Sequence, residues 1–488
     1  MDKMKRNYIL NTMFQVLRLL TPLVVTPHIS RVLGVDGVGV FSYTYSIQYY
    51  FSIFAVLGTT AYGAREIARN RDNKEETSRL FWEIALQAVC TSLVSLTAWG
   101  IFIAVSGEYT LYYSILTLYI VAAMLDISWF FTGLERFPEI VGKNIAVRLL
   151  ETASIFIFVR KPSDLYLYFI IMACGTFFGN VSLWASLPKY LVKVKASSLN
   201  VFRHLKGTLI FFLPTIATSI YTVLDKTLIG AITKDTAQNG AYEQATKIIE
   251  IAKAVSFVSL NTVMGPRSAY LYAQNKFDEV KSALKGSMNF MLFLSIGVAF
   301  GISGVSGIFV PWFFGEGFGL VVVLLKCLSP IIVVISISNA LGYQYYDPSG
   351  KRLKSAKYLV VGAVCNLILN CLLIPHLRSV GAVIGSVVSE MVISALYLKN
   401  CEGYLKLSDL AKMAWKKLIA GGAMLVLLLA LSSKLQPIWW QVVLAILAGG
   451  SLYILILLLL RDSVIFSAAE KIVEFIKKFF KKRKGTEQ

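Results

Sequence analysis

The chain has 488 residues, of which 56% are hydrophobic and only 16% are charged, and its mean hydropathy is +0.65. Soluble domains carry about 25% charged residues, so this composition excludes a soluble multidomain enzyme, a disordered chain and a coiled coil. The formal net charge is +20, and an all-α polytopic membrane protein is the class that remains.

Fourteen apolar runs of about 20 residues predict fourteen transmembrane helices. Their connections are short, so no large domain outside the membrane is expected. The predicted spans lie near residues 8–30, 38–63, 81–105, 110–132, 141–159, 165–187, 208–230, 241–263, 286–307, 319–342, 357–375, 381–399, 415–432 and 438–460.

Lys and Arg divide unevenly between alternate loops. With the N-terminus inside, about 36 of these residues fall in cytoplasmic segments and about 6 in the opposite loops. An excess of this kind is typical of cytoplasmic loops, and the even number of spans returns the C-terminus to the cytoplasm. We therefore expect a multi-pass protein of the cytoplasmic membrane with both ends inside. The few basic residues of the opposite loops are Arg31, Arg160, Lys161, Lys234, Arg378 and Lys434.

The two ends of the chain carry different signals. The basic N-terminus runs into an apolar stretch up to Val25 without a small-residue cleavage site, which predicts a first transmembrane helix rather than a removable leader. Residues 462–488 place Ile and Phe at helical spacing among lysines. This pattern predicts a basic amphipathic helix on the inner leaflet, although a solvated tail would have a similar composition.

A weak internal repeat indicates two halves. Residues 30–43 place a basic residue, apolar residues, Gly, a polar turn and then Gly and Tyr at the end of span one and the start of span two. Residues 224–242 repeat this order at spans seven and eight. Many transporters consist of two such halves around a central cavity. The predicted domains are an N-terminal six-helix lobe (1–206), a C-terminal six-helix lobe (207–400), two extra helices (401–461) and the tail (462–488).

Motifs of the common enzyme classes are missing from the sequence. It contains no GxxxxGK[ST] loop, no HExxH and no GxSxG. Three scattered histidines and six cysteines without metal-ligand spacing predict no metal site and no cofactor. We therefore expect a transporter without catalytic residues or nucleic-acid partners.

Basic residues inside the predicted spans are the main candidates for substrate binding. A charge near the bilayer midplane costs about 2.5–3.5 kcal/mol and persists where it faces a wet cavity or a partner. We expect Arg18, Lys253 and Lys326 to lack an anionic partner, which favours an anionic substrate. Lys247 and Arg148 have nearby carboxylates, and buried ion pairs that only fix helix packing are an equal alternative for them. The full set is Arg18, Arg148, Lys226, Lys247, Lys253 and Lys326.

Acidic and aromatic residues accompany these cations. Coupling ions such as Na⁺ or H⁺ would require intramembrane carboxylates, for which the candidates are Asp126, Glu151, Glu250 and Glu390. Tyrosine offers an apolar ring and a hydroxyl suited to sugars. Span two carries Tyr45, Tyr49 and Tyr50, of which Tyr49 and Tyr50 lie near its middle. An interfacial aromatic belt is the alternative. Prolines at 22, 27 and 214 predict bends, either as hinges or as fixed kinks.

Taken together, the fourteen spans, the two lobes, the Ser-Arg-Val-Leu-Gly-x-x-Gly-x-Gly stretch at 30–39 and the Leu-Asp-Lys-Thr-Leu-Ile-Gly stretch at 224–230 resemble polysaccharide repeat-unit flippases. These proteins belong to the multidrug/oligosaccharidyl-lipid/polysaccharide exporter superfamily. The resemblance covers essentially the whole chain. It implies two bundles around a cavity that opens alternately to each side, and movement of an undecaprenyl-diphosphate-linked oligosaccharide to the outer leaflet for O-antigen, capsule or exopolysaccharide synthesis. It also implies that cavity cations hold the diphosphate, a role carried over by location only.

Two other functions remain open at this stage. A multidrug or cation antiporter of related architecture should have an acidic cavity, and a peptidoglycan-precursor (lipid II) flippase is a sibling whose signature we do not find. A membrane glycan polymerase or ligase would need a large external loop, which the sequence lacks. The expected partners are the lipid-linked oligosaccharide, membrane lipids, a polysaccharide polymerase and glycosyltransferases.

Overall fold

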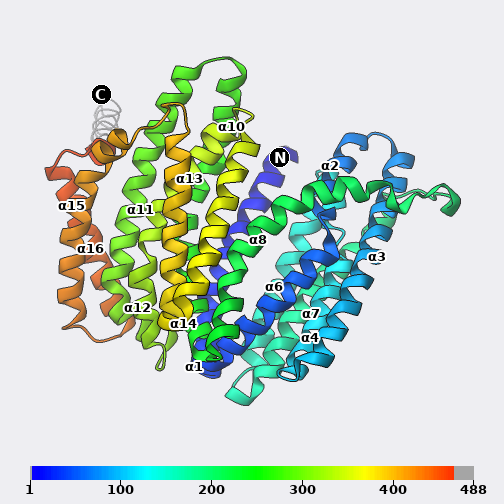
Figure 1. The fold of residues 1–488 in the computed structure, drawn as a ribbon, viewed down its shortest axis with the longest axis horizontal. Helices are drawn as coiled ribbons and strands as arrows, with labels where there is room; N and C mark the ends of the chain where they lie inside the picture. Colours follow the sequence, from blue (N-terminus) through cyan, green and yellow to red (C-terminus); the bar gives the residue numbers. More distant parts are fainter. Residues whose placement is uncertain (1–2, 467–488) are drawn as a thin grey trace, which may run out of the picture. The chain divides into compact units, whose positions relative to one another are not determined.

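The computed structural model describes residues 3–466, and it describes their side chains except at 3–20, 213–215 and 217–222. All regular secondary structure in this range is helical (Figure 1). The elements are α1 (Lys3–Val56), α2 (Thr59–Asn70), α3 (Lys74–Ser106), α4 (Thr110–Met124), α5 (Ser128–Gly133), α6 (Phe137–Phe158), η1 (Pro162–Asp164), α7 (Leu165–Trp184), η2 (Leu187–Lys189), η3 (Ala196–Ser198), η4 (Val201–His204), α8 (Leu205–Thr233), α9 (Thr236–Lys253), η5 (Ala254–Val258), α10 (Ser259–Ala273), α11 (Phe277–Phe314), α12 (Gly319–Leu328), α13 (Pro330–Leu341), η6 (Gly342–Tyr346), α14 (Arg352–Lys399), α15 (Leu407–Ser432) and α16 (Trp439–Leu459).

The helices confirm the all-α polytopic membrane architecture. Among the described residues, ten helical segments are long and apolar enough to cross a membrane. α1 and α14 each contain two predicted spans, and one non-helical residue divides each of them, Gly34 in α1 and Arg378 in α14. Helices α6 and α8 lie at two further predicted spans. The architecture is therefore compatible with fourteen spans.

Packing divides the chain into two compact units, Met1–Glu243 and Gln244–Gln488. In the first unit α1 packs on α3 and α4, and α7 packs on α4 and α6. One core cluster of this unit centres on Trp99, Tyr113 and Phe169. A second centres on Phe81 and Trp129. The predicted lobe boundary at residue 206 stays a prediction.

The second unit is organised around α11. This helix packs on α13 and α15, and α16 packs on both α15 and α11. Tyr453 and Met424 belong to a buried cluster at this contact. The Tyr453 hydroxyl donates a hydrogen bond to the carbonyl of Phe293 at 2.9 Å, which anchors α16 to α11.

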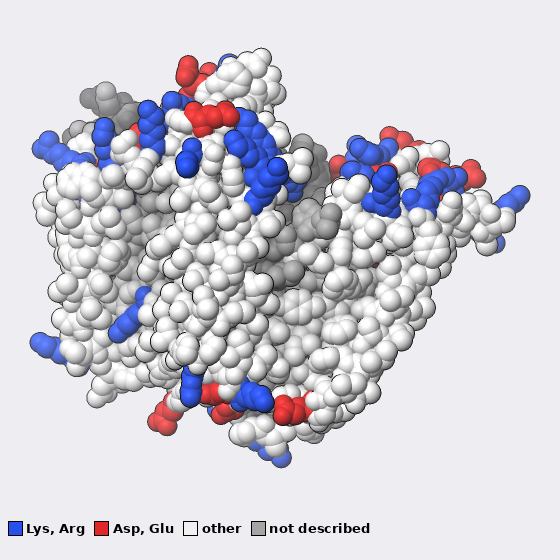
Figure 2. Space-filling model, viewed as in Figure 1, with Lys and Arg blue, Asp and Glu red and all other residues white. Residues whose placement is uncertain are grey.

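Charged side chains are concentrated at the helix ends. Within the first unit, many Lys and Arg of the visible face gather at the end that carries the α2–α3 turn; within the second, many gather at the end that carries the α10–α11 turn (Figure 2). The band between the two ends is nearly uncharged in each unit. Exposed apolar residues such as Val94 on α3, Val364 on α14 and Leu447 on α16 lie away from the ends of these long helices, as expected for surfaces that face lipid.

Candidate functional site: a charged and tyrosine-rich wall in the first unit

Arg148 and Glu151 form an ion pair near the middle of α6. The guanidinium Nη1 lies 2.8 Å from Glu151 Oε1. The Glu151 carboxylate is buried, whereas the Arg148 side chain is 38% exposed. Arg148 lies within electrostatic range of Tyr45 on α1 and Tyr168 on α7. It therefore projects on the side of α6 that faces α1 and α7, and part of the guanidinium remains available to a ligand.

Glu151 fits against α7 because residue 175 has no side chain. A Cβ atom at Gly175 would lie 2.7 Å from Glu151 Oε2 and 3.1 Å from its Cδ. Real Cβ contacts of 2.7 Å are essentially absent from proteins. Gly175 is therefore part of the geometry that positions the carboxylate beside Arg148.

A second polar cluster joins α1, α8 and α9 within the same unit. Lys226 Nζ lies 2.6 Å from Glu243 Oε2, and the Ser42 hydroxyl donates to the same oxygen at 3.0 Å. The next residue on α8, Thr227, donates to the hydroxyl oxygen of Ser46 at 2.9 Å and to that of Tyr50 at 3.3 Å. The Glu243 carboxylate therefore balances the charge of Lys226. This arrangement agrees with the alternative in which an intramembrane cation forms an ion pair that only fixes helix packing.

The predicted tyrosines separate into two environments. The Tyr45 ring packs with Tyr49 and Tyr119, with ring centroids 6.2 and 5.2 Å apart. Tyr50 points instead toward Thr227 on α8. Tyr45 lies within electrostatic range of both Arg148 and Glu243. We use the name charged wall for Arg148, Glu151, Tyr45, Lys226 and Glu243.

The two repeated sequence motifs lie against each other inside the first unit. A Cβ atom on Gly39 would collide with the carbonyl of Thr236, and one on Gly240 would collide with the carbonyl of Val35. The Thr236 hydroxyl donates to Asp36 at 2.6 Å. The glycines of both motifs therefore permit close backbone contact between the turn of α1 and the α8–α9 turn.

The second unit holds the remaining described cations, and one expectation about them is wrong. Lys253 is not unpaired, because its Nζ lies 2.8 Å from Glu250 Oε1, one helical turn earlier on α9. Glu250 is 68% exposed, so this pair is open to its surroundings. Lys326 is exposed on α12 and has no ion pair among the described residues. Lys247 is half-buried on α9.

The acidic candidates also occupy different settings. Asp126 lies within predicted span four, which the structure divides into α4 and α5. There Asp126 Oδ1 accepts a hydrogen bond from the backbone N–H of Ser128 at 2.8 Å, as Asp side chains do in turns when they bond to the backbone two residues further on. Glu390 is buried in the second half of α14. Arg18 belongs to α1, and its side chain lies outside the described residues, as does most of the predicted tail.

Comparison with known proteins places this architecture in a family. Residues 4–271, more than half of the chain, match the family described as polysaccharide biosynthesis protein. The chain belongs to this family.

One relative and two solved structures match most of the chain. A protein of Escherichia coli K12 named "Putative O-antigen transporter" is 24% identical over 406 residues, which is 81% of this chain and 96% of that protein. The structure of a protein titled as the lipid II flippase MurJ superposes with a TM-score of 0.71 at 14% identity, covering 94% of this chain and 99% of that one. An inward-facing multidrug resistance MATE transporter gives a TM-score of 0.58 at 14% identity, with coverages of 81% and 94%. At such low identity these two structures establish the fold.

Two buried polar contacts of this family member were missed by the sequence analysis. Lys417 on α15 is fully buried and pairs with Asp462 at 2.8 Å. His204 joins Tyr62 and Glu83 through hydrogen bonds of 2.8 and 2.7 Å. The partners lie 45 to 142 residues apart in the chain, so helical spacing gives no signal for either contact.

A cavity of about 580 Å³ in the second unit is lined by residues outside the spans predicted from the sequence. Its lining includes Tyr272, Tyr404, Lys351 and Glu402. The hydrogen bond from Lys351 lowers the pKa of the exposed Glu402 carboxyl below its ordinary value. Lys351 also donates to the Tyr345 hydroxyl at 3.0 Å. The ion pair between Lys351 and Glu402 joins the segment before α14 to the segment after it. Among the described residues, no group of three His, Cys, Asp or Glu side chains is arranged to hold a metal ion.

Proposed function

We propose that this chain is a flippase. In this proposal it moves an undecaprenyl-diphosphate-linked oligosaccharide from the inner to the outer leaflet of the cytoplasmic membrane by alternating access, for surface polysaccharide synthesis. Membership of the polysaccharide biosynthesis family and similarity to a protein named as an O-antigen transporter support it. The multi-pass helical architecture supports a transporter rather than an enzyme.

The observation that carries the proposal is the partly exposed guanidinium of Arg148 near the middle of α6, a helix that lies at a predicted membrane span. A cation at this depth is costly unless it has an anionic partner. Glu151 accepts a hydrogen bond from one of its nitrogens, Nη1, at 2.8 Å. Because a guanidinium has five N–H donors in a planar fork, it can bind a phosphate through two of them at once. Arg148 therefore suits the diphosphate of a lipid-linked sugar.

The remaining residues are assigned by their chemistry. Arg18, Lys226, Lys247, Lys253 and Lys326 are proposed to line the path of the diphosphate. Tyr45, Tyr49 and Tyr50 are proposed to contact sugar rings. Glu151, Glu250 and Glu390 remain candidates for ion coupling, whereas the hydrogen bond of Asp126 within the turn before α5 favours a structural role for that residue.

The domains, the membrane orientation and the partners that we propose are those predicted from the sequence. Residues 1–206 and 207–400 would form the two six-helix lobes, 401–461 the extra helices and 462–488 a cytoplasmic tail. Both termini would be cytoplasmic. Glycosyltransferases would supply the lipid-linked oligosaccharide, and a polymerase would consume it.

Transport by the purified full-length protein in liposomes tests this function. The measurement is the rate at which an undecaprenyl-diphosphate-linked oligosaccharide becomes accessible on the opposite leaflet. We expect Arg148→Ala to lower the rate at least about tenfold, because a hydrogen bond to a charged group contributes about 1.5–3 kcal/mol. Arg148→Lys should retain part of the activity, since it keeps the charge but not the bidentate geometry.

Arg160→Ala provides the matched control. Arg160 follows the same helix and is exposed, and its side chain donates a hydrogen bond to the carbonyl of Ile157 at 2.8 Å. This variant should transport like the unmodified protein. Equal rates for the Arg148→Ala and Arg160→Ala variants would contradict the proposed role of Arg148.

A panel of substrates separates the alternatives. The proposal requires movement of the lipid-linked oligosaccharide and no efflux of cationic drugs. Drug efflux without oligosaccharide movement would replace the proposal with a multidrug antiporter. A strict preference for lipid II would replace it with a peptidoglycan-precursor flippase.

A further inference from the structure

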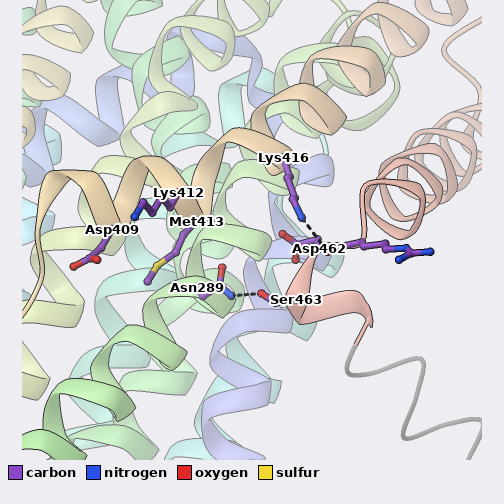
Figure 3. A pocket seen from close by; sticks show the side chains of 8 residues that line it. Asn289, Asp409, Lys412, Met413, Lys416, Asp462 and Ser463 are labelled. Carbon is purple, nitrogen blue, oxygen red and sulfur yellow. Dashed lines mark hydrogen bonds between the residues drawn. The ribbon is translucent and has the colours of Figure 1, made fainter.

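A small cavity lies at one end of the α15–α16 helix pair. Its volume is about 250 Å³, and all of its lining belongs to the second unit (Figure 3). α15 contributes its first turns, α11 contributes Asn289, and the turn after α16 closes the cavity. The lining residues are Asn289, Asp409, Lys412, Met413, Lys416, Arg461, Asp462 and Ser463.

Buried and bridging contacts build this cavity. Lys417 is fully buried and donates to Asp462 and to the side-chain oxygen of Asn289, each at 2.8 Å. The amide nitrogen of Asn289 in turn donates to the Ser463 hydroxyl at 2.9 Å (Figure 3). The turn after α16 is therefore fixed to α11 and α15 by directional bonds.

Both carboxylates of the lining are already neutralised. Asp462 pairs with Lys417, and Asp409 pairs with Lys285 on α11 at 2.9 Å. Neither lysine belongs to the lining. The carboxylates therefore leave no unbalanced negative charge in the cavity.

Three basic side chains of the lining form no ion pair with a carboxylate among the described residues. In the described part of the chain, Lys412, Lys416 and Arg461 form no ion pair, and Lys416 donates only to the backbone carbonyl of Arg461 at 3.0 Å. Lys412 and Arg461 are exposed. The cavity therefore presents an excess of positive charge, which favours an anion.

The cavity lies at the depth of lipid headgroups. α15 has 26 residues, about 39 Å, whereas a hydrocarbon core is about 30 Å thick. Exposed Trp415 lies about 26 Å along this helix from its end at Ser432, and exposed Trp439 begins α16 beyond the short connection. Tryptophan is enriched at both membrane interfaces. Lys412 and Lys416 flank Trp415 in sequence and so lie at or near one interface.

We propose that this cavity binds the headgroup phosphate of an anionic membrane lipid. The excess of positive charge selects an anion, and the exposed apolar residues Leu418 and Ile419 next along α15 offer a surface for the acyl chains. Basic pockets between membrane helices bind anionic headgroups in this way. A volume of about 250 Å³ is suited to one small headgroup, since pockets for drug-sized ligands start at about 300 Å³. The site is separate from the charged wall, and its ligand is not the transported substrate.

Native mass spectrometry of the full-length protein in a nonionic detergent tests this site. Phosphatidylglycerol and phosphatidylcholine are the two probes, and the measurement is the apparent Kd of each. We expect the anionic lipid to bind at least about tenfold more tightly. Lys412→Ala/Arg461→Ala should weaken phosphatidylglycerol binding about tenfold and leave phosphatidylcholine unchanged, because charge-assisted bonds to phosphate are lost. Lys416 is retained in this variant because it also holds the backbone of Arg461.

Lys357→Ala/Lys399→Ala is the matched control. Both lysines are exposed near the two ends of α14, outside the cavity lining, and their removal changes the net charge equally. Phosphatidylglycerol binding that is unchanged in the cavity variant, or reduced equally in the control, would overturn the site. Displacement of the lipid by an equal concentration of inorganic phosphate would overturn the lipid as ligand in favour of free phosphate. These binding measurements do not depend on transport activity, so they test the lipid site independently of the flippase proposal.

Discussion

At the scale of single residues, the space left by Gly175 controls the position of Glu151. We predict that Gly175→Ala displaces the Glu151 carboxylate and weakens its bond to Arg148, because the added methyl group would lie 2.7 Å from Oε2. The fold should persist, since the displaced atom ends a flexible side chain and alanine favours a helix over glycine by about 1 kcal/mol. Transport of the lipid-linked oligosaccharide in liposomes should fall, while the midpoint of thermal unfolding stays nearly constant.

Gly142→Ala is the natural comparison for this substitution. Gly142 lies on α6, and an added Cβ there would meet no atom within 4 Å. It should gain the same helix propensity without touching Glu151. If both glycine variants transport equally well, the fit between Gly175 and Glu151 has no role in transport.

Local spacing explains which contacts could be predicted from the sequence. Arg148 and Glu151 are three residues apart, and the structure pairs them as helix geometry requires. Lys253 and Glu250 have the same spacing, and the expectation of an unpaired lysine was wrong because that spacing was overlooked. The bond between Lys417 and Asp462 joins residues 45 positions apart, so only the packing of α15 against the end of α16 creates it.

At the scale of helices, the Lys417–Asp462 pair fixes the end of α16 to α15. We predict that Lys417→Met lowers the free energy of unfolding by about 3–5 kcal/mol, because it leaves the Asp462 charge buried without a partner. Asp462→Leu should have a similar effect. The double variant Lys417→Met/Asp462→Leu should regain most of the loss, because neither charge remains. Denaturant titration in mixed micelles measures these differences.

The exposed Lys412, on the same helix, supplies a control for this cycle. Lys412→Met should change the free energy of unfolding by no more than about 0.5 kcal/mol, as surface substitutions do. Two results would show that the Lys417–Asp462 pair does not stabilise the packing of α15 and α16. The single variants could be as stable as Lys412→Met, or the double variant could lose as much stability as the two single variants together.

The helices themselves were largely predictable, because hydropathy reports burial in lipid directly. The spans predicted at 415–432 and 438–460 correspond to α15 and α16 within eight residues at every end. Breaks within spans were not predictable. A turn at Leu57 and Gly58, both with positive φ, interrupts predicted span two. Span four divides in the turn between α4 and α5, where the Asp126 carboxylate accepts a hydrogen bond from the backbone of Ser128. Such breaks depend on a few hydrogen bonds that leave the mean hydropathy unchanged.

At the scale of the whole molecule, the charge of the proposed substrate links transport to the membrane potential. A diphosphate carries about two negative charges, and each charge that crosses 100 mV changes the free energy by about 2.3 kcal/mol. Export from a negative interior is therefore favourable by several kcal/mol if the diphosphate crosses the field. Cations such as Arg148 would return with the empty carrier, which the same potential attracts toward the interior.

This reasoning predicts that the potential, rather than an ion gradient, drives transport. In liposomes with a K⁺ diffusion potential, collapse of the potential should slow movement of the lipid-linked oligosaccharide severalfold, while collapse of the pH or Na⁺ gradient at constant potential should not. Arg148→Ala should reduce the dependence of the residual rate on potential, because one fewer positive charge moves with the carrier. A transport rate that does not depend on the potential but depends on the H⁺ or Na⁺ gradient would refute this mechanism. That result would direct attention to Glu151 and Glu390, whose buried carboxylates could then bind the coupling ion.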